Sequence, residues 1–600
     1  MKKYFILLAG TFLFSQMDAQ VPNEDNVLFV NQNVSGGNGD GSSWGNAIAH
    51  LSDALKWARE NQQSPTWSAD EPLQIWVAEG TYKPLYDAAD TEYTTNGDRD
   101  NSFVLIKNVQ IYGGFSGTET SLEERDWEAN ATILSGNIGD EADIYDNVYH
   151  IVISAGDVEE ALLDGFTLTD GRGDGSIFGG PVVNEIEINN GGGAINTRSS
   201  APLFRNLKVD NNQGYWGGQI FNYQSSPTFE NMEITNGWAF WGGGVYNRDA
   251  NPVFNNVYIA ENYGDLAGGG MYGVEYGHID LNNVTFYKNT TGTGNGGQGG
   301  GFYSYVQVGL EMNNVSFIEN FADSAGGAIG YVADGLDNDV LFQNCLFVGN
   351  KTGGHGGAIL FYDSQKEINF KIESSTFYGN ESATGGALGV WYDQEEGGIP
   401  IEFNNSIVWD NTSSIGGSPN PTFVINNSLL QDAECPAGLD CNNVIFNEDP
   451  IFTDAENGDF SLQQNSPAVN AGNNDLFTGL DENTLDLAGN ARVYGFGNGG
   501  MIDLGAFEYQ GGMNVSDLNS ASKLSFYPNP VKRGNELTIL SNEDGNSKLS
   551  LISLTGQIVY SSDFSGNTIQ LSLPQNIQAG IYILKLDSGK VSKAVKLIVQ

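Results

Sequence analysis

The chain has 600 residues, with 74 Asp or Glu against 26 Lys or Arg, which gives a formal net charge of −48. A surface this acidic repels phosphate backbones and anionic membranes, so nucleic acid is excluded as an expected partner. Only three cysteines occur, too few for a disulfide scaffold. Cys435 and Cys441 are close enough in sequence to close one loop with a disulfide. Cys345 is expected to behave as a buried small hydrophobic residue.

The amino terminus has the pattern of a secretory signal peptide over residues 1–20. Lys2 and Lys3 precede an apolar run from Phe5 to Phe14, and the small residue Ala19 follows. This run is too short to cross a bilayer, and no later stretch has the length and apolar character of a membrane helix. We therefore expect an exported chain whose mature part has no transmembrane segment.

Residues 21–510 are predicted to form one domain that opens with an amino-terminal cap at residues 27–145. The segment 46–60 contains the one convincing amphipathic helix of the chain, just before a predicted strand at 75–78. Its apolar residues recur at helical spacing: Ile48, Leu51, Leu55 and Ala58. This helix is expected to cover the first end of the domain.

The region 191–430 contains clear internal repeats. Between Gly192 and Leu388 the chain returns eight times to a pair of glycines, usually followed by two apolar residues, and the second glycines lie 25 to 31 residues apart. In most copies an apolar residue stands two before an Asn, and a second Asn follows six later, as in Phe254, Asn256 and Asn262. Self-similarity at a fixed period is the signature of a solenoid.

About three short strands fit into each period, because runs of Val, Ile, Phe, Tyr and Thr are split by Gly, Asn and Asp turns. This pattern predicts a right-handed parallel β-helix, in which each strand pairs with its equivalent one coil away at about 4.8 Å. Apolar residues would form continuous inner rows, and the Asn residues could form amide ladders. The fold class is therefore all-β, with a helical cap, and both ends of the solenoid need covering.

Several segments near the two ends of this domain resemble known secreted proteins. Phe29–Val30 with Gly36–Trp44, and Val109–Ser121, look like the start of bacterial pectin-lyase-like β-helix proteins, and Asp503–Tyr509 in the closing segment 431–510 resembles the end of the same group, often called choice-of-anchor proteins. The repeats are also similar to those of polymorphic outer-membrane adhesins. These resemblances imply the coiled fold and leave the activity open.

The last part of the chain is predicted to be a separate small β-sandwich at residues 523–600, after a polar linker at 511–522. It has eight Lys or Arg and five Asp or Glu, a net +3, in contrast to the acidic remainder. Phe526–Pro530, Leu554–Gln557 and Ala579–Tyr582 resemble the type A sorting domain of type IX secretion. The resemblance implies that the type IX machinery is a partner and that the protein is secreted across the outer membrane, to the extracellular space or the cell surface.

Catalytic residues are not evident in the repeats. A lyase of this fold would need Arg, Lys or His as a base with calcium as the helper, and the basic residues are scattered, although Arg248 and His278 lie about one repeat apart. A hydrolase would need a carboxyl pair, for which Asp363, Asp393 and Glu395 are only three of many loop carboxylates. Whether the protein is an enzyme stays open, and so does calcium, the one candidate cofactor, because the acidic surface could serve solubility alone.

Aromatic residues give the best candidate binding site. Tyr246, Tyr272 and Tyr303 occupy the same place in three consecutive coils, with Phe221 before them. If the residues before them face inward, the tyrosines form an exposed ladder able to stack against sugar rings; otherwise they belong to the core. The candidate carbohydrate-binding residues also include three tryptophans expected in turns: Trp216, Trp238 and Trp241.

The sequence therefore favours a surface-delivered β-helix that binds an extracellular polysaccharide or surface glycan, as an adhesin or a glycan-capture protein. Two alternatives remain. One is a polysaccharide lyase or glycoside hydrolase of the pectin-lyase-like fold, and the other is a structural surface or matrix protein. Fold alone does not decide among them.

Overall fold

The computed structural model describes most of the chain. The described residues are 20–63, 65–89, 98–176, 178–189, 191–306, 308–333, 339–363, 369–392, 401–417, 423–497, 499–510, 525–527, 529, 531–540, 546–553, 558–566, 568–574, 577, 580–587 and 592–599. The predicted signal peptide, apart from Gln20, and the predicted linker lie outside them. The chain forms two compact units, one of residues 1–451 and 465–509, the other of residues 452–464 and 510–600.

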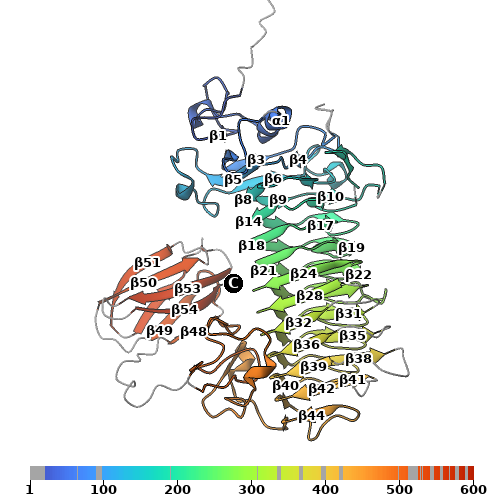
Figure 1. Cartoon of the computed structure of the whole chain (residues 1–600). Helices are drawn as coiled ribbons and strands as arrows, with labels where there is room; N and C mark the ends of the chain where they lie inside the picture. The colour runs from blue at the N-terminus through green and yellow to red at the C-terminus, as the bar shows by residue number, and fades with distance from the viewer. Residues whose placement is uncertain are drawn as a thin grey trace, which may run out of the picture. The chain divides into compact units, whose positions relative to one another are not determined.

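The first unit is a parallel β-helix, as the repeats predict (Figure 1). One coil contains β16 (Gln213–Gly214), β17 (Ile220–Tyr223) and β18 (Thr228–Thr235), and the next contains β19 (Trp238–Trp241), β20 (Val245–Arg248) and β21 (Val253–Ala260). Each strand pairs in parallel with its successor, so that Ile220 lies opposite Val245. The stacked coils build sheets of 25, 11 and 7 strands.

The 11-stranded sheet contains β4 (Phe103–Val104), β7 (Val152–Ala155), β13 (Ile195–Arg198), β17, β20, β23 (Met271–Val274), β27 (Phe302–Tyr305), β31 (Ile329–Ala333), β35 (Ile359–Asp363), β38 (Leu388–Tyr392) and β41 (Ile415–Gly417). The 7-stranded sheet contains β10 (Arg172–Gly173), β16, β19, β22 (Tyr263–Ala267), β26 (Thr290–Thr291), β30 (Phe321–Ala322) and β34 (Lys351–Thr352). Strands of both sheets alternate between inward and outward side chains.

The 25-stranded sheet forms the rest of each coil. Its strands are β1 (Val27–Val30), β2 (Leu73–Ala78), β3 (Gly80–Tyr82), β5 (Val109–Phe115), β6 (Thr132–Ser135), β8 (Leu162–Asp164), β9 (Thr167–Thr169), β14 (Leu203–Arg205), β15 (Lys208–Asp210), β18, β21, β24 (Gly277–Asn282), β25 (Thr285–Tyr287), β28 (Val308–Asn313), β29 (Ser316–Ile318), β32 (Val340–Gln343), β33 (Leu346–Val348), β36 (Phe370–Glu373), β37 (Thr376–Tyr378), β39 (Ile401–Asn404), β40 (Ile407–Trp409), β42 (Val424–Asn426), β43 (Leu429–Leu430), β44 (Asp440–Asn442) and β45 (Ile445–Phe446).

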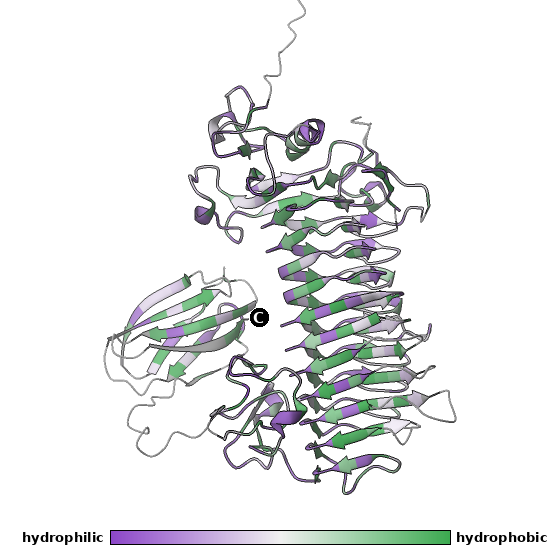
Figure 2. Ribbon diagram, in the orientation of Figure 1, coloured by the Kyte–Doolittle hydropathy of each residue, from purple (hydrophilic) through white to green (hydrophobic). Residues whose placement is uncertain are grey.

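The interior of the solenoid is built from stacked rows of identical residues. Phe286, Phe317, Phe347 and Phe377 are fully buried, and their rings stack with centroids 4.5 to 5.2 Å apart. Burial of one such side chain contributes roughly 1.5–3 kcal/mol, and no coil can bury its ring without a neighbour. Figure 2 shows hydrophobic residues recurring along the stacked strands.

The predicted amide ladder is present. The Nδ2 atom of each Asn donates to the Oδ1 atom of the next at 2.8–3.0 Å, along the row Asn262, Asn289, Asn320, Asn350, Asn380 and Asn411. The first five of these side chains are fully buried, where an unpaired amide would cost about 1–3 kcal/mol. The ladder satisfies each buried amide only when the coils are in register.

The amino-terminal end is covered by a helix, as predicted, but the helix begins later than expected. The helix α1 spans Leu51–Asn61, because Ile48 pairs with Val30 as an extended residue instead. Leu51, Ala54 and Leu55 of α1 are buried in the main core. A one-turn 3₁₀ helix at Trp44–Asn46 precedes it.

The closing residues 465–509 fold back along the coils. Thr478 donates to the carboxylate of Glu373 in β36 through both its backbone nitrogen and its hydroxyl, and Asn405 after β39 donates its side-chain nitrogen to the Asn473 carbonyl. The fully buried Arg492 of this segment donates to the carbonyls of Asp503 and Gly505 at 2.8 Å. The bonds to Glu373 and Asn405 attach the segment to the last coils, whereas those of Arg492 lie within the segment.

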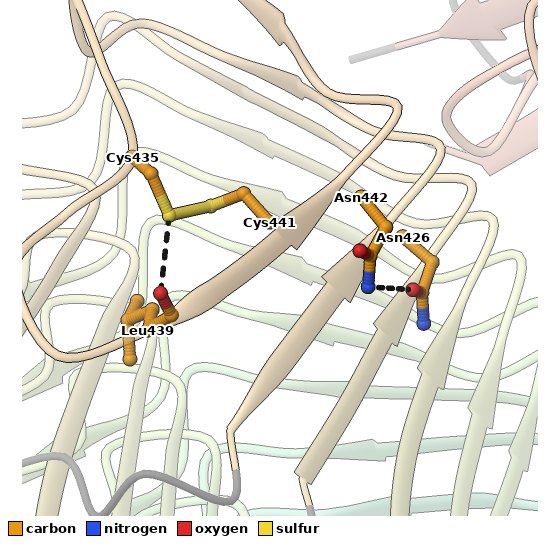
Figure 3. The surroundings of a disulfide bond; sticks show 5 residues. All are labelled: Asn426, Cys435, Leu439, Cys441 and Asn442. Carbon is orange, nitrogen blue, oxygen red and sulfur yellow. Dashed lines mark hydrogen bonds between the residues drawn. A yellow bond between two sulfur atoms is a disulfide. The ribbon is translucent and has the colours of Figure 1, made fainter.

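The cysteines lie as the sequence predicts. Cys435 and Cys441 form a disulfide that closes the loop before β44, near the hydrogen bond between Asn442 and Asn426 (Figure 3). Cys345 is fully buried, and burial raises the pKa of its thiol to about 12. It therefore packs as a small hydrophobe.

The second unit is a small β-sandwich of two antiparallel sheets around its own core, as predicted. The first sheet contains β48 (Ser525–Tyr527), β49 (Glu536–Leu540) and β52 (Thr568–Ser572), and the second contains β51 (Ile558–Ser565), β50 (Asn546–Ser553), β53 (Gly580–Asp587) and β54 (Ser592–Val599). The hairpin of β46 (Phe452–Asp454) and β47 (Asp459–Leu462) is grouped with this unit.

Candidate functional site

The candidate tyrosines stand on the outer face of the 11-stranded sheet. Phe221, Tyr246, Tyr272 and Tyr303 occupy one register position in β17, β20, β23 and β27. The preceding residue of each strand faces inward: Ile220, Val245, Met271 and Phe302 are fully buried in the main core. Because neighbouring residues of a strand point to opposite faces, the four rings of this row, here called the aromatic row, face outward.

The aromatic row is nevertheless covered, so of the two arrangements left open by the sequence the exposed ladder is wrong, and the rings are buried although they face outward. Tyr246, Tyr272 and Tyr303 are only 7%, 8% and 9% exposed. Their rings pack on one another, with centroids 5.1 and 5.5 Å apart. Five partly buried side chains also pack against the row: Trp216, Tyr223, Trp241, Val274 and Val332. Burial raises the pKa of all three phenols. The row is thus a second apolar cluster, separate from the interior.

The tryptophans lie beside the row at the 7-stranded sheet. Trp238 and Trp241 are in strand β19 instead of a turn, because the chain pairs there with β16 and β22. Trp238 is 38% exposed, whereas Trp216 and Trp241 are half-buried. The backbones of Trp216 and Trp241 pair as a parallel β-bridge between neighbouring coils. The structure therefore places the tryptophans together, next to the tyrosines.

Two further aromatic residues complete this group. Tyr215 lies 4.9 Å from Phe240 and 5.4 Å from Trp216 between ring centroids, and Phe240 lies 5.2 Å from Trp238. We call the five rings the aromatic patch: Tyr215, Trp216, Trp238, Phe240 and Trp241. The sequence analysis missed Tyr215 and Phe240, although each adjoins a tryptophan that it singled out.

A cavity of about 360 Å³ opens over the first part of the aromatic row. We call it the aromatic pocket, and the residues that line it are Phe178, Glu187, Asn189, Arg198, Trp216, Phe221, Tyr223, Tyr246 and Arg248. Trp216 belongs to both the pocket and the patch, so the two surfaces are continuous. Of the predicted residues, Trp216 and Tyr246 line the pocket, whereas Tyr272 and Tyr303 support it as part of the row.

One wall of the pocket comes from an insertion between coils. The hairpin of β11 (Val182–Val183) and β12 (Ile186–Glu187) interrupts the repeat. Val183 and Ile188 pack on Val104 and Ile153, which belong to the outer face of the same sheet. The hairpin carries Glu187 to the pocket, and the sequence analysis missed it because it has no counterpart in the other coils.

Two arginines of the pocket lie over the ring of Tyr223. The Arg198 and Arg248 guanidinium carbons lie 4.5 and 5.5 Å from the centre of the Tyr223 ring. Arg248 forms a bidentate ion pair with Glu275, in which both contacts are 2.8 Å, and this pairing raises the pKa of Arg248. Such a pair holds the guanidinium in place.

Arg198 differs from Arg248 in having no such partner. Within the described part of the chain, its side chain contacts the Tyr223 ring and makes no hydrogen bond or ion pair. Burial lowers its pKa, whereas the negative charge of Glu187 opposes this effect. An arginine stays protonated at neutral pH, so the pocket contains a cation with free donors in a strongly acidic protein.

Of the residues weighed for catalysis, only Arg248 and His278 can be placed, and they pair with different carboxylates. Arg248 lies in β20 and pairs with Glu275, whereas His278 lies in β24 of another sheet and pairs with Asp280 at 2.9 Å. Asp393 and Glu395 lie outside the described residues, and so does the side chain of Asp363. The pocket residues provide aromatic faces, two guanidinium groups and the Glu187 carboxylate.

Comparison with known proteins identifies the carboxy-terminal part of the chain. Residues 525–600 match the family model of the secretion system C-terminal sorting domain. No curated protein matches the chain at a significant level. Among the described residues, no helix has both the length and the apolar character needed to span a membrane. The sorting domain indicates that the type IX secretion system exports this protein to the cell surface or the extracellular space.

Proposed function

We propose that the β-helix binds an extracellular or cell-surface polysaccharide, as an adhesin or glycan-capture protein, with the aromatic pocket and aromatic patch as the binding surface. The observation that carries the proposal is a set of aromatic side chains, joined at Trp216, beside the Arg198 guanidinium, which has no ion-pair partner among the described residues. Export through the type IX route supports it, because the protein then meets such polymers.

The shape of the surface favours a polymer over a small solute. The pocket has the volume of an ordinary ligand site, and the adjoining patch has two well-exposed rings, Tyr215 and Trp238. Aromatic faces pack against the apolar faces of sugar rings. One sugar in the pocket and its neighbours along the patch would therefore be bound together.

The charge of the pocket favours a sugar with an acidic group. Arg198 presents free guanidinium donors, whose planar arrangement matches a carboxylate or a sulfate ester. Glu187 also lines the pocket and would repel an anion placed close to it, so the acidic group is expected at the Arg198 guanidinium and away from Glu187. Neutral polymers would lack this charge-assisted contact.

The test is retention of the protein in gels that contain neutral, carboxylated or sulfated polysaccharides, with and without calcium. We expect retention by one of the acidic polymers, reduced about tenfold or more by Arg198→Gln, because hydrogen bonds to charged groups contribute about 1.5–3 kcal/mol. Trp238→Ala should weaken retention about threefold to tenfold through lost stacking. The matched control is Tyr258→Ala, an equally exposed aromatic residue on the 25-stranded sheet.

The same samples distinguish the alternatives. New reducing ends or unsaturated-product absorbance would establish cleavage and contradict a purely binding role. Retention by no polymer would favour a structural or protein-directed role. Retention that Arg198→Gln and Trp238→Ala leave unchanged would contradict the assignment of the surface.

A further inference from the structure

At three places on the 25-stranded sheet a charged residue pairs with the opposite charge one coil away. Arg205 lies opposite Asp164, and Lys371 lies opposite Glu402, and each pair forms an ion pair. Lys208 and Glu233 follow the same rule. Opposite charges in register stabilise neighbouring strands, whereas like charges destabilise them.

Strands β24 and β28 break this rule. Asp280 of β24 lies directly opposite Glu311 of β28, so two carboxylates stack in register. Glu311 makes no hydrogen bond or ion pair with any side chain that the structure describes. Asp339, just before β32, adds another negative charge near this position. Among the residues that the structure describes, no Lys or Arg pairs with Asp280 or Glu311.

A histidine lies beside the two carboxylates. His278 is two residues before Asp280, so both side chains point outward from the same strand, and His278 Nε2 lies 2.9 Å from Asp280 Oδ1. The residue opposite His278 is Gly309, and a Cβ atom at that position would collide with Nδ1 of the imidazole. Gly309 therefore provides the space in which the ring sits.

The donor atoms of the three side chains converge. One ligand atom from each of His278, Asp280 and Glu311 lies within 4.8 Å of the other two. Zn²⁺ binds imidazole nitrogen and carboxylate oxygen at about 2.0–2.2 Å, which small side-chain rotations bring within reach. His278 and Glu311 are exposed, and Asp280 is half-buried, so a cation can enter from solvent.

We propose that His278, Asp280 and Glu311 bind a divalent transition-metal cation of the zinc type, which joins the coils of β24 and β28. Imidazole favours zinc and its neighbours over calcium, whose ligands are oxygen atoms. Three protein ligands leave a position for water. The site lies on a different sheet from the aromatic pocket, so it goes beyond the proposed function and does not depend on it.

The test uses the whole chain, purified without a histidine tag and freed of metal with a chelator. Titration with Zn²⁺ is followed by calorimetry, and Co²⁺ is added as a probe whose absorbance reports nitrogen and oxygen ligands. We expect one bound Zn²⁺ per chain, with an affinity at least tenfold weaker in His278→Gln and in Glu311→Gln. Both substitutions are conservative and lie at exposed positions.

Matched controls separate this site from adventitious binding. His355→Gln removes another exposed histidine, and Glu319→Gln removes an exposed carboxylate that pairs with Lys288; both should leave Zn²⁺ affinity unchanged. Circular dichroism checks that each variant is folded. The proposal is overturned by the absence of a Zn²⁺ site, by equal losses in the control variants, or by a site that prefers Ca²⁺ and is indifferent to His278→Gln.

Discussion

The two faces of the 11-stranded sheet follow different rules. The inward position is apolar in every coil from β13 to β41, as in Ile195, Met271 and Ile415. The outward position changes abruptly: after Tyr303 the same register is occupied by Gly330, Leu360, Gly389 and Gly416. The aromatic row is confined to β17, β20, β23 and β27, which identifies the outer face of these coils as the specialised region.

The largest expected loss of folding stability comes from substitutions in the inner rows. Phe317→Ala should lower the free energy of unfolding by about 3–5 kcal/mol, because it removes a ring stacked on both sides in the core. Trp238→Ala, on the outer surface, should change it by no more than about 0.5 kcal/mol. Urea unfolding followed by circular dichroism measures both. Equal losses would contradict the distinction between the inner and outer faces of the coils.

The two rows of asparagines sharpen the comparison. Asn320→Ala should cost about 1–3 kcal/mol, because it breaks the buried ladder on both sides. The outer row, joined for example by Asn283 and Asn256, has positive φ angles such as 55° at Asn283, a conformation that glycine adopts readily. Asn283→Gly should therefore have a small effect in the same unfolding assay, and a loss as large as that of Asn320→Ala would contradict this account.

The closing segment has a polar interior, in contrast to the apolar coils, and its stability should depend on pH. Burial, together with the negative charge of Asp503, raises the pKa of Glu508 to about 8. The folded chain then retains a proton that the unfolded chain releases near the ordinary value of 4.5. Stability should therefore fall as the pH rises from about 4.5 to about 8 and then level off. Melting temperatures across this range should show the fall, and Glu508→Gln should reduce it.

The smallest expected effect concerns Cys345. Because its thiol is fully buried and its pKa is raised to about 12, iodoacetamide should not modify it in the folded protein at neutral pH. Mass spectrometry of alkylated native and denatured samples measures this. Rapid modification of the native protein would indicate that the inner face opens to solvent.

The sequence predicts the coil well and the outer surface poorly. Inner rows such as Phe286 and Phe317 repeat at every coil because each position faces the same neighbour, so the period alone predicts the fold. The start of α1 was misplaced because Ile48 has an apolar side chain in either a helix or a strand. Register with Val30, which depends on the tertiary fold, decides between them.

The candidate site was only partly predictable for the same reason. The spacing of Tyr246 and Tyr272 predicts that they stack, but their cover depends on Trp216 and Trp241, which come from another face of the coil. The hairpin that carries Glu187 lies outside the repeat, and whether Arg198 has a partner depends on three-dimensional contacts. Departures from the repeat, more than the repeat itself, indicate where the site lies.

The most direct measurement is hydrogen exchange of the protein with and without the polysaccharide that retains it most strongly. The account predicts that bound polymer slows exchange in β17, β19, β20 and the β11–β12 hairpin, which surround the aromatic pocket and patch. The later coils, where Gly330 and Gly389 replace the aromatic row, should be unaffected. Protection confined to those later coils, or no polymer-dependent protection at all, would contradict the central claim.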